Sequence, residues 1–242
     1  CQKGKGPDKA RERLKNFLQR FYRKHGTAGY VLKCDIKGYY PNMSHKVVKD
    51  CFKKVIDGWT YQQACCVLDN QYDREIGYNP GSQMIQIAGI GILNALDHFI
   101  KEELHIEFYI RYMDDFILIH EDAEYLLECK ARIAQRLRAL ECQFNTKKTG
   151  IIPLSDGILF LGFYYRLTET GKVVMTLNSA NIKHERRKMT KLAALERKGE
   201  RSTEKVDECY NSWKNHASKG DSYKLLQRTD KYVKELRKEE SK

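Results

Sequence analysis

The first part of the chain alternates hydrophobic and basic positions at helical spacing. Beginning at Asp8, which we interpret as an N-cap, the apolar residues of 14–22 recur every three or four positions until Gly26. Lys and Arg occupy the intervening positions. The pattern predicts an amphipathic, basic helix.

Further along, strand-like and helix-like patterns alternate. They predict a strand over 30–36, helices over 44–56 and 60–68, an apolar helix over 84–100, a hairpin over 108–120, a helix over 121–140, strands at 151–152, 158–165 and 173–177, and basic helices beyond 180. The order strand, helices, two strands, helix, strand is that of the split β-α-β (ferredoxin-like) arrangement. We therefore predict an α+β fold in which a sheet is backed by two helices.

The predicted hairpin carries two adjacent carboxylates, Asp114 and Asp115, in its turn. Like charges this close repel and raise each other's pKa unless a cation lies beside them. A solvated Asp-Asp turn is the alternative interpretation of the dipeptide alone. However, Asp35 ends the first predicted strand just before Lys37-Gly38, and the predicted topology allows it to lie beside the turn. Three carboxylates are then expected to converge.

Charge is distributed unevenly around this acidic centre. Residues 1–26 contain 9 Lys/Arg and 2 Asp/Glu, and residues 180–242 contain 18 and 11, within a net charge of +12. Basic ends around an acidic middle suit a protein that binds a polyanion at a metal-dependent site. Helices that merely carry solvated Lys and Arg remain an alternative for either end.

Length and cysteines add broader expectations. The 242 residues suffice for one large or two small domains, and the start at Cys1 suggests a piece of a longer chain. No apolar run reaches the roughly 18 residues of a membrane span, and the eight scattered cysteines contain no C-x-x-C pair. We predict a soluble, cytoplasmic protein with free thiols.

The acidic cluster indicates a reaction class. Carboxylate oxygens are hard ligands that suit Mg²⁺, with Mn²⁺ as an alternative ion. Two such ions roughly 3.5 to 4 Å apart assist an in-line phosphoryl displacement. With basic segments to hold a polyanion, nucleotidyl transfer is the expected chemistry.

Five short motifs, in order, resemble those of bacterial reverse transcriptases, the family found in group II introns, diversity-generating elements and phage defence. They are Asp35–Tyr40 (Asp-Ile-Lys-Gly-Tyr-Tyr), Gly77–Gln86, Tyr112–Asp115 (Tyr-Met-Asp-Asp), Asn145–Thr149 and Phe160–Phe163. An isolated Tyr-Met-Asp-Asp would be a weak signal, whereas the ordered set is a specific one. Residues 77–86 depart from the commonest family spelling of their motif.

The resemblance implies a right-hand polymerase. Residues 1–28 would be part of the fingers, 29–178 the palm with finger helices inserted at about 44–75, and 179–242 a helical, basic thumb. The implied activity is that of an RNA-directed DNA polymerase, which adds deoxynucleotides to a primer 3′ end with two metal ions.

The resemblance also implies roles for individual residues. Asp35, Asp114, Asp115 and the Ile36 carbonyl would bind metal, and Lys148 would lie near the pyrophosphate leaving group, with Lys147 as a competitor for that role. Tyr40 would be the aromatic gate that blocks a ribose 2′-OH. The implied nucleotide-binding residues are Lys3, Lys5, Ile36, Lys37, Gly38, Tyr39, Tyr40, Pro80, Gly81 and Ser82, and the implied primer grip is Phe160, Leu161 and Gly162.

Expected partners are an RNA template, a DNA or RNA primer, deoxynucleoside triphosphates, and an RNA or protein accessory factor, without a membrane. A catalytically silent nucleic-acid binding module, such as an RNA scaffold or a maturase-like splicing cofactor, is the alternative. Intact carboxylates argue against it, because without a metal they repel phosphate.

Overall fold

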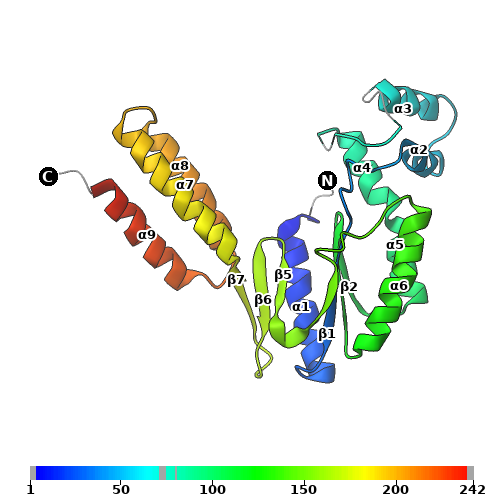
Figure 1. The fold of residues 1–242 in the computed structure, drawn as a ribbon, viewed down its shortest axis with the longest axis horizontal. Coiled ribbons are helices and arrows are strands. Elements are labelled where there is room, and N and C mark those ends of the chain that lie inside the picture. The colour runs from blue at the N-terminus through cyan, green and yellow to red at the C-terminus, as the bar shows by residue number, and fades with distance from the viewer. Residues whose placement is uncertain (1–3, 71–74, 80, 239–242) are drawn as a thin grey trace. The chain divides into compact units, whose positions relative to one another are not determined.

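The computed structural model describes residues 4–70, 75–79 and 81–238, and Lys3 and Pro80, both predicted to bind nucleotide, lie outside them. The chain divides between Asp156 and Gly157 into two compact units (Figure 1). This division falls inside the predicted palm of residues 29–178, and the domains expected from the sequence stay a prediction.

The first unit is built on a four-stranded sheet. Its strands are β1 (Tyr30–Asp35), β2 (Phe108–Tyr112), β3 (Asp115–His120) and β4 (Gly150–Pro153), in the spatial order β2-β3-β1-β4. Each neighbouring pair is antiparallel. This is the order that the split β-α-β arrangement requires, so the predicted fold class is confirmed.

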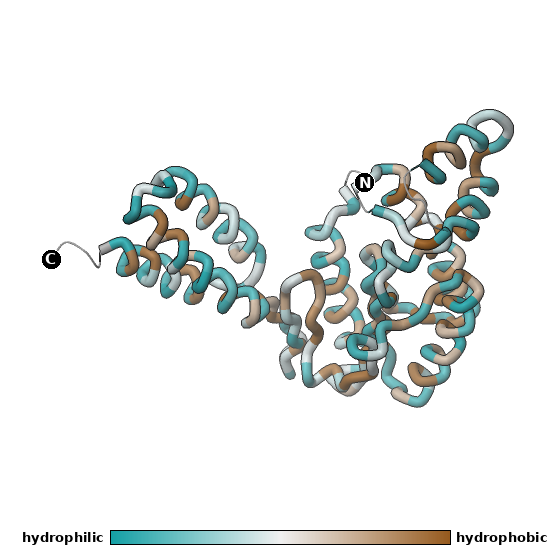
Figure 2. Tube along the Cα trace, turned by 45° about the horizontal axis from the view of Figure 1, so that its top comes forward, coloured by the Kyte–Doolittle hydropathy of each residue, from teal (hydrophilic) through white to brown (hydrophobic). Residues whose placement is uncertain are grey.

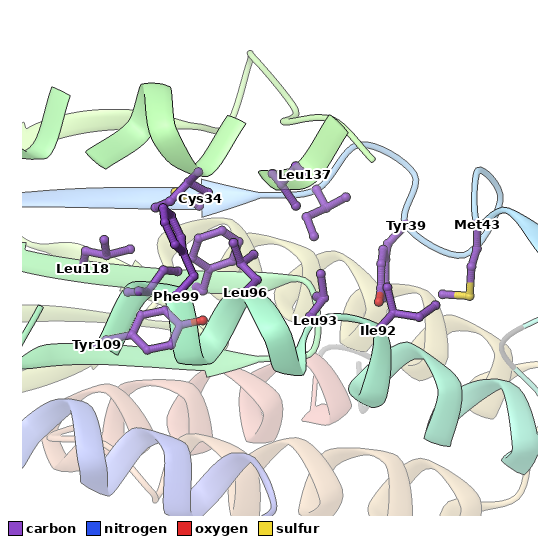
Figure 3. Close-up of a cluster of buried hydrophobic side chains, with 14 of the residues drawn as sticks. Cys34, Tyr39, Met43, Ile92, Leu93, Leu96, Phe99, Tyr109, Leu118 and Leu137 are labelled. Carbon is purple, nitrogen blue, oxygen red and sulfur yellow. The ribbon is translucent and has the colours of Figure 1, made fainter. Parts of the chain in front are cut away.

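Helices cover both faces of this sheet (Figure 1). On one face, strand residues such as Leu32 and Phe116 share a core with α5 (Asn94–His98), the π-helical turn Phe99–Glu103 and α6 (Ala123–Ala139). Figure 3 shows part of this core, with Tyr109 beside the helix that carries Leu96.

The opposite face of the sheet lies against α1 (Pro7–His25). Phe17 and Phe21 of this helix meet the Phe108 ring edge-on, with ring centroids 5.8 and 5.6 Å apart. The predicted basic helix is therefore correct, except that its N-cap is Gly6 and Asp8 lies inside the first turn.

Three further helices join β1 to α5: α2 (His45–Lys53), α3 (Gly58–Asn70) and α4 (Gln83–Ile92). Ser44 caps α2 as predicted, because its side chain accepts a hydrogen bond from the Val47 N–H. The helix predicted over 44–56 ends earlier, at Lys53, so Val55 lies beyond its end and is exposed.

The long apolar helix predicted over 84–100 is wrong in one respect, because it is broken after α4. Leu93 separates α4 from α5 with φ −84° and ψ 0°, and the last turn continues as a π-helix. Gly89 and Gly91 lower helix propensity just before the break. A Cβ on Gly91 would lie 3.1 Å from the Cys51 sulfur, so the glycine allows α2 to pack closely against α4.

The second unit contains a three-stranded antiparallel sheet and three helices. The strands are β5 (Ile158–Phe160), β6 (Phe163–Leu167) and β7 (Val173–Leu177), and the helices are α7 (Ser179–Arg197), α8 (Thr203–Ala217) and α9 (Tyr223–Lys238). The single strand predicted over 158–165 is instead two strands joined by a turn at Leu161-Gly162. The helices predicted beyond 180 are thus present, and Figure 2 shows that they carry both hydrophilic and hydrophobic residues.

Two broader features follow from the residues described. None of their helices is long and apolar enough to cross a membrane. Every cysteine among them is a free thiol.

Candidate active site

The pairing of β1 with β3 sets the position of the acidic residues. Asp35 is the register partner of Asp115, so the two side chains leave the same face of the sheet. The next residue, Ile36, donates its N–H to the Asp114 carbonyl at 3.3 Å. Asp35 is thus brought to the same end of two central strands as Asp114 and Asp115, although it precedes Asp114 by 79 positions in the sequence.

The turn that carries Asp114 is tight. Tyr112 pairs with Asp115, which leaves only Met113 and Asp114 between β2 and β3. Met113 has φ 57°, in the left-handed region that a side chain with a Cβ rarely adopts. The Arg111 guanidinium donates to the Met113 carbonyl at 3.0 Å, which stabilises this conformation.

The loop after α6 holds Asp35 on both its side chain and its backbone. Asn145 Nδ2 donates to Asp35 Oδ1 at 2.9 Å, and Lys148 Nζ lies 3.3 Å from Asp35 Oδ2. The Thr149 hydroxyl accepts from the Asp35 N–H at 3.1 Å. Lys148, rather than Lys147, is therefore the lysine whose ammonium contacts a predicted metal ligand.

Burial and mutual repulsion act on the other two carboxylates. Burial raises the pKa of Asp115 to about 6, helped by the charges of Asp35 and Asp114 and opposed by Lys33. The pKa of Asp114 is also raised, again mainly by burial. Asp115 Oδ1 is buried and accepts no hydrogen bond.

These residues fit a divalent cation. An orphaned buried carboxylate oxygen beside two further carboxylates is a donor set that Mg²⁺ prefers. Within residues 4–70, 75–79 and 81–238, no three His, Cys, Asp or Glu side chains already form a group that can hold an ion. The predicted convergence is thus incomplete: Asp35 is bonded to Asn145 and Lys148, and repulsion opposes closer approach of the carboxylates.

Tyr39 and Tyr40 lie between the acidic residues and α4. The Tyr39 hydroxyl donates to the Gly89 carbonyl at 2.6 Å. Tyr40 is half-buried, its hydroxyl is buried without a hydrogen-bond partner, and the charge of Asp114 adds to burial in raising its pKa. A Cβ on Gly89 would lie 3.2 Å from that hydroxyl, so the Tyr40 side chain packs against α4 at Gly89.

The remaining predicted nucleotide-binding residues lie in loops. Lys5, Lys37, Gly38 and Gly81 are exposed, and Ser82 is half-buried at the start of α4. Gly38 adopts φ 51°, and a Cβ there would meet the Asn42 side chain at 2.7 Å. The Gly81 N–H donates to Asn79 Oδ1 at 3.0 Å, which orders the turn before the helix.

The predicted primer grip forms the turn of the β5–β6 hairpin in the second unit. Phe160 pairs with Phe163, and Leu161 and Gly162 between them both have positive φ, 46° and 85°. Two left-handed residues in a two-residue loop are typical of a type I′ turn. The Gly162 carbonyl accepts from the Asn178 N–H at 3.1 Å, which ties the turn to the start of α7.

Sequence reasoning missed Asp97 and Arg111, which bond one another beside the acidic turn. Arg111 precedes Tyr112 directly, so its place next to the motif was a usable signal. Asp97 lies in an apolar helix, and a lone carboxylate there predicts a buried cationic partner.

The sheet order and the acidic residues at its end define the class of fold, which is that of the right-hand polymerases. Residues 4–165 match the family described as "Reverse transcriptase (RNA-dependent DNA polymerase)". This match covers well over half of the chain, and the chain belongs to that family.

Solved structures of other proteins have a similar fold. The chain is similar to apo telomerase from Candida tropicalis truncated from its C-terminal domain, at TM-score 0.55 and 18% identity over 70% of this chain and 40% of the other. It is also similar to telomerase from Candida albicans in complex with a fragment of telomeric RNA, at TM-score 0.53 and 15% identity over 74% and 37%. The chain therefore spans about 40% of the length of these proteins. A comparison with curated protein sequences finds no match.

Proposed function

We propose that this chain is an RNA-directed DNA polymerase that adds deoxynucleotides to a primer 3′ end. The observation that carries the proposal is the Asp35–Asp115 register, with Asp114 in the adjoining turn. It supports the proposal because it gathers carboxylates from distant sequence in a member of the reverse transcriptase family.

Asp35, Asp114, Asp115 and the Ile36 carbonyl are the proposed ligands of two Mg²⁺ ions, with Mn²⁺ as the alternative. When bound, such ions activate the attacking oxygen and stabilise the leaving one. The protein's own residues would orient the reactants. Lys148, whose ammonium lies 3.3 Å from the Asp35 carboxylate, would stand close to the pyrophosphate as it leaves.

The other assignments follow the same proposal. Tyr40, resting on Gly89, would exclude the ribose 2′-OH, and Gly81 and Ser82 would contact the nascent base pair. Lys5, Lys37, Gly38 and Tyr39 would contact the nucleotide, and Phe160–Gly162 would hold the primer end. Residues 1–28, 29–178 and 179–242 would serve as partial fingers, palm and thumb. A bacterial origin and a cytoplasmic location remain predictions.

Primer extension by the chain tests the proposal. A labelled primer is annealed to matched RNA and DNA templates and incubated with deoxynucleotides and Mg²⁺. We expect extension by the wild type and none by Asp114→Asn, with template–primer binding retained. Equal extension by both proteins would contradict the assignment of Asp114.

Binding without extension by the wild type would instead favour a catalytically silent RNA-binding module. A matched control is Asp57→Asn, because Asp57 is an exposed carboxylate that lies in none of the five motifs. It should extend primers as the wild type does.

A further inference from the structure

Arg111 and Asp97 form a bidentate ion pair between β2 and α5. Arg111 Nε donates to Asp97 Oδ1 at 2.7 Å, and Arg111 Nη2 donates to Asp97 Oδ2 at 2.5 Å. The Tyr109 hydroxyl donates to the same Asp97 Oδ1 at 2.6 Å. The Arg111 side chain is only 10% exposed, so this pair is largely removed from water.

The remaining donors of the guanidinium reach backbone carbonyls on two other segments. Arg111 Nη1 donates to the Met113 carbonyl at 3.0 Å, inside the acidic turn. Arg111 Nη2 also lies 3.4 Å from the Ile90 carbonyl, in the last turn of α4. The carbonyls of the last helical turn receive no hydrogen bond from within the helix, so this contact supplies one of them with a donor. One cation thus joins α4, α5 and the turn.

A fold-stabilising role alone does not explain this arrangement. Buried ion pairs are often no more stabilising than apolar side chains of similar volume. The surrounding positions are already apolar, since Leu93 and Leu96 are buried in the same core as Tyr109 (Figure 3). The planar fork of an arginine is, however, suited to holding several acceptors in fixed positions at once.

The Arg111 guanidinium contacts the residue of the turn with the most strained backbone, Met113. Met113 is the residue with left-handed φ, and its carbonyl is followed directly by Asp114. Because strained backbone persists only where neighbours over-determine it, losing the Arg111 contact would let the turn relax and displace Asp114.

We propose that Arg111 is a positioning residue, which together with Asp97 fixes the Tyr112–Asp115 turn against α4 and α5 and so sets the place of Asp114 relative to Asp35. The inference rests on the proposed polymerase function, because it concerns the proposed metal ligands. The inference adds that Arg111 bonds both to the acidic turn and to α4, the helix that follows the proposed base-pair loop.

Arg111→Lys is the principal test, because lysine keeps the charge but loses the planar fork. We expect kcat for primer extension to fall about 10²-fold, as for a small misplacement of a reacting group. The KM for the deoxynucleotide and the template–primer Kd should change little. Mn²⁺ titration of the primer–template complex should show affinity weakened by about 10- to 100-fold. Hydrogen exchange at the Asp114 amide should accelerate.

The control is Arg136→Lys, which alters an exposed pair with Glu103 at 3.1 Å and should leave all five measurements unchanged. If Arg111→Lys does not fold, Tyr109→Phe removes one bond to Asp97 without changing charge and should give the same effects in weaker form. A lower melting temperature with unchanged kcat, Mn²⁺ affinity and amide exchange would overturn the positioning role.

The test separates this inference from the proposed function. A wild type that binds Mn²⁺ but does not extend primers would contradict the polymerase proposal alone. Mn²⁺ affinity and amide exchange would still decide whether Arg111 holds the turn.

Discussion

Asn145 and Asp35 are joined by two hydrogen bonds although they lie in distant parts of the chain. The Asn145 side-chain amide donates to Asp35 Oδ1 at 2.9 Å, and its backbone N–H donates to the Asp35 carbonyl at 2.7 Å. The first bond fixes the carboxylate rotamer and the second fixes the strand end. Asn145 is thus the residue through which the loop after α6 orients a proposed metal ligand.

Asn145→Ala should lower kcat about tenfold, because a hydrogen bond to a charged group contributes about 1.5 to 3 kcal/mol and its loss frees the carboxylate. Template–primer binding should be retained. Single-turnover primer extension measures the effect. Gln143→Ala, at an exposed position in the same loop, is the matched control, and a similar loss in both variants would contradict a specific role for Asn145.

Tyr40→Ala should raise ribonucleotide incorporation about 10- to 100-fold relative to deoxynucleotides, a range typical of steric discrimination in a pocket. Competing extension with the two nucleotide types on one template measures the ratio. If sugar selectivity is unchanged, Tyr40 is not the gate, whereas the polymerase proposal is unaffected.

Gly89→Ala should shift selectivity in the opposite direction. The added methyl would lie 3.2 Å from the Tyr40 hydroxyl, a tight contact that pushes the ring away from α4. If the ring moves toward the nucleotide, the KM for deoxynucleotides rises and ribonucleotides are excluded further. Gly150→Ala is the control, because a Cβ there meets nothing within 4 Å. Equal KM values for Gly89→Ala and the wild type would show that Gly89 does not set the position of Tyr40.

Asp115→Asn should stabilise the metal-free protein at neutral pH. The folded-state pKa of Asp115 is raised to about 6, so the folded protein binds this proton more tightly than the unfolded chain. The stability contributed by protonated Asp115 is therefore present below about pH 4 and is lost as the pH rises through about 6. A shift of about two pH units corresponds to about 3 kcal/mol.

Urea unfolding of wild type and variant in EDTA, from pH 4 to pH 8, measures this difference. The two proteins should be similar near pH 4, and the variant should be the more stable near pH 8. A difference that does not change with pH would contradict the raised pKa.

Template–primer binding should depend steeply on salt, because 44 Lys and Arg residues outnumber 32 Asp and Glu. A protein that makes 6 to 10 phosphate contacts loses about 10³- to 10⁵-fold in affinity between 50 and 200 mM salt. Fluorescence anisotropy with a labelled primer–template across this range checks the prediction. A flat titration would show that the basic segments do not bind the phosphate backbone.

The order of helices and strands was predictable from the sequence because its hydrophobic periodicity is strong. The strand ending at Asp35 and the hairpin at Tyr112–Asp115 are both correct, and with the helices between them they predict the observed sheet order. Local signals were enough here, since strand-like and helix-like patterns alternate along this part of the chain.

The incorrect predictions are those in which a continuous apolar segment contains a break or a turn. Met84 to Ile100 was predicted as one helix, but Leu93 interrupts it. Ile158 to Tyr165 was predicted as one strand, although Leu161-Gly162 turns the chain. Periodicity alone does not detect a break when residues on both sides of it are buried.

The placement of the acidic residues was predictable from the sequence, whereas their roles stay predictions. Asp35, Asp114 and Asp115 stand out by their positions at strand ends, and the structure gathers them at one end of the sheet. Asp97 and Asn145 act through partners that are distant in sequence, and such pairings depend on tertiary packing that no local pattern reports.

The antiparallel register of β1 and β3 also determines which kinds of mutation the site tolerates. Side chains alternate between faces along a strand, so one inserted or deleted residue in β3 would put Phe116 or Asp114 opposite Asp35. Substitutions along these strands alter the core but leave the carboxylates opposed. Changes in strand length, by contrast, separate them at once, so descendants of this chain should vary in its loops and helices while the number of residues in β3 stays constant.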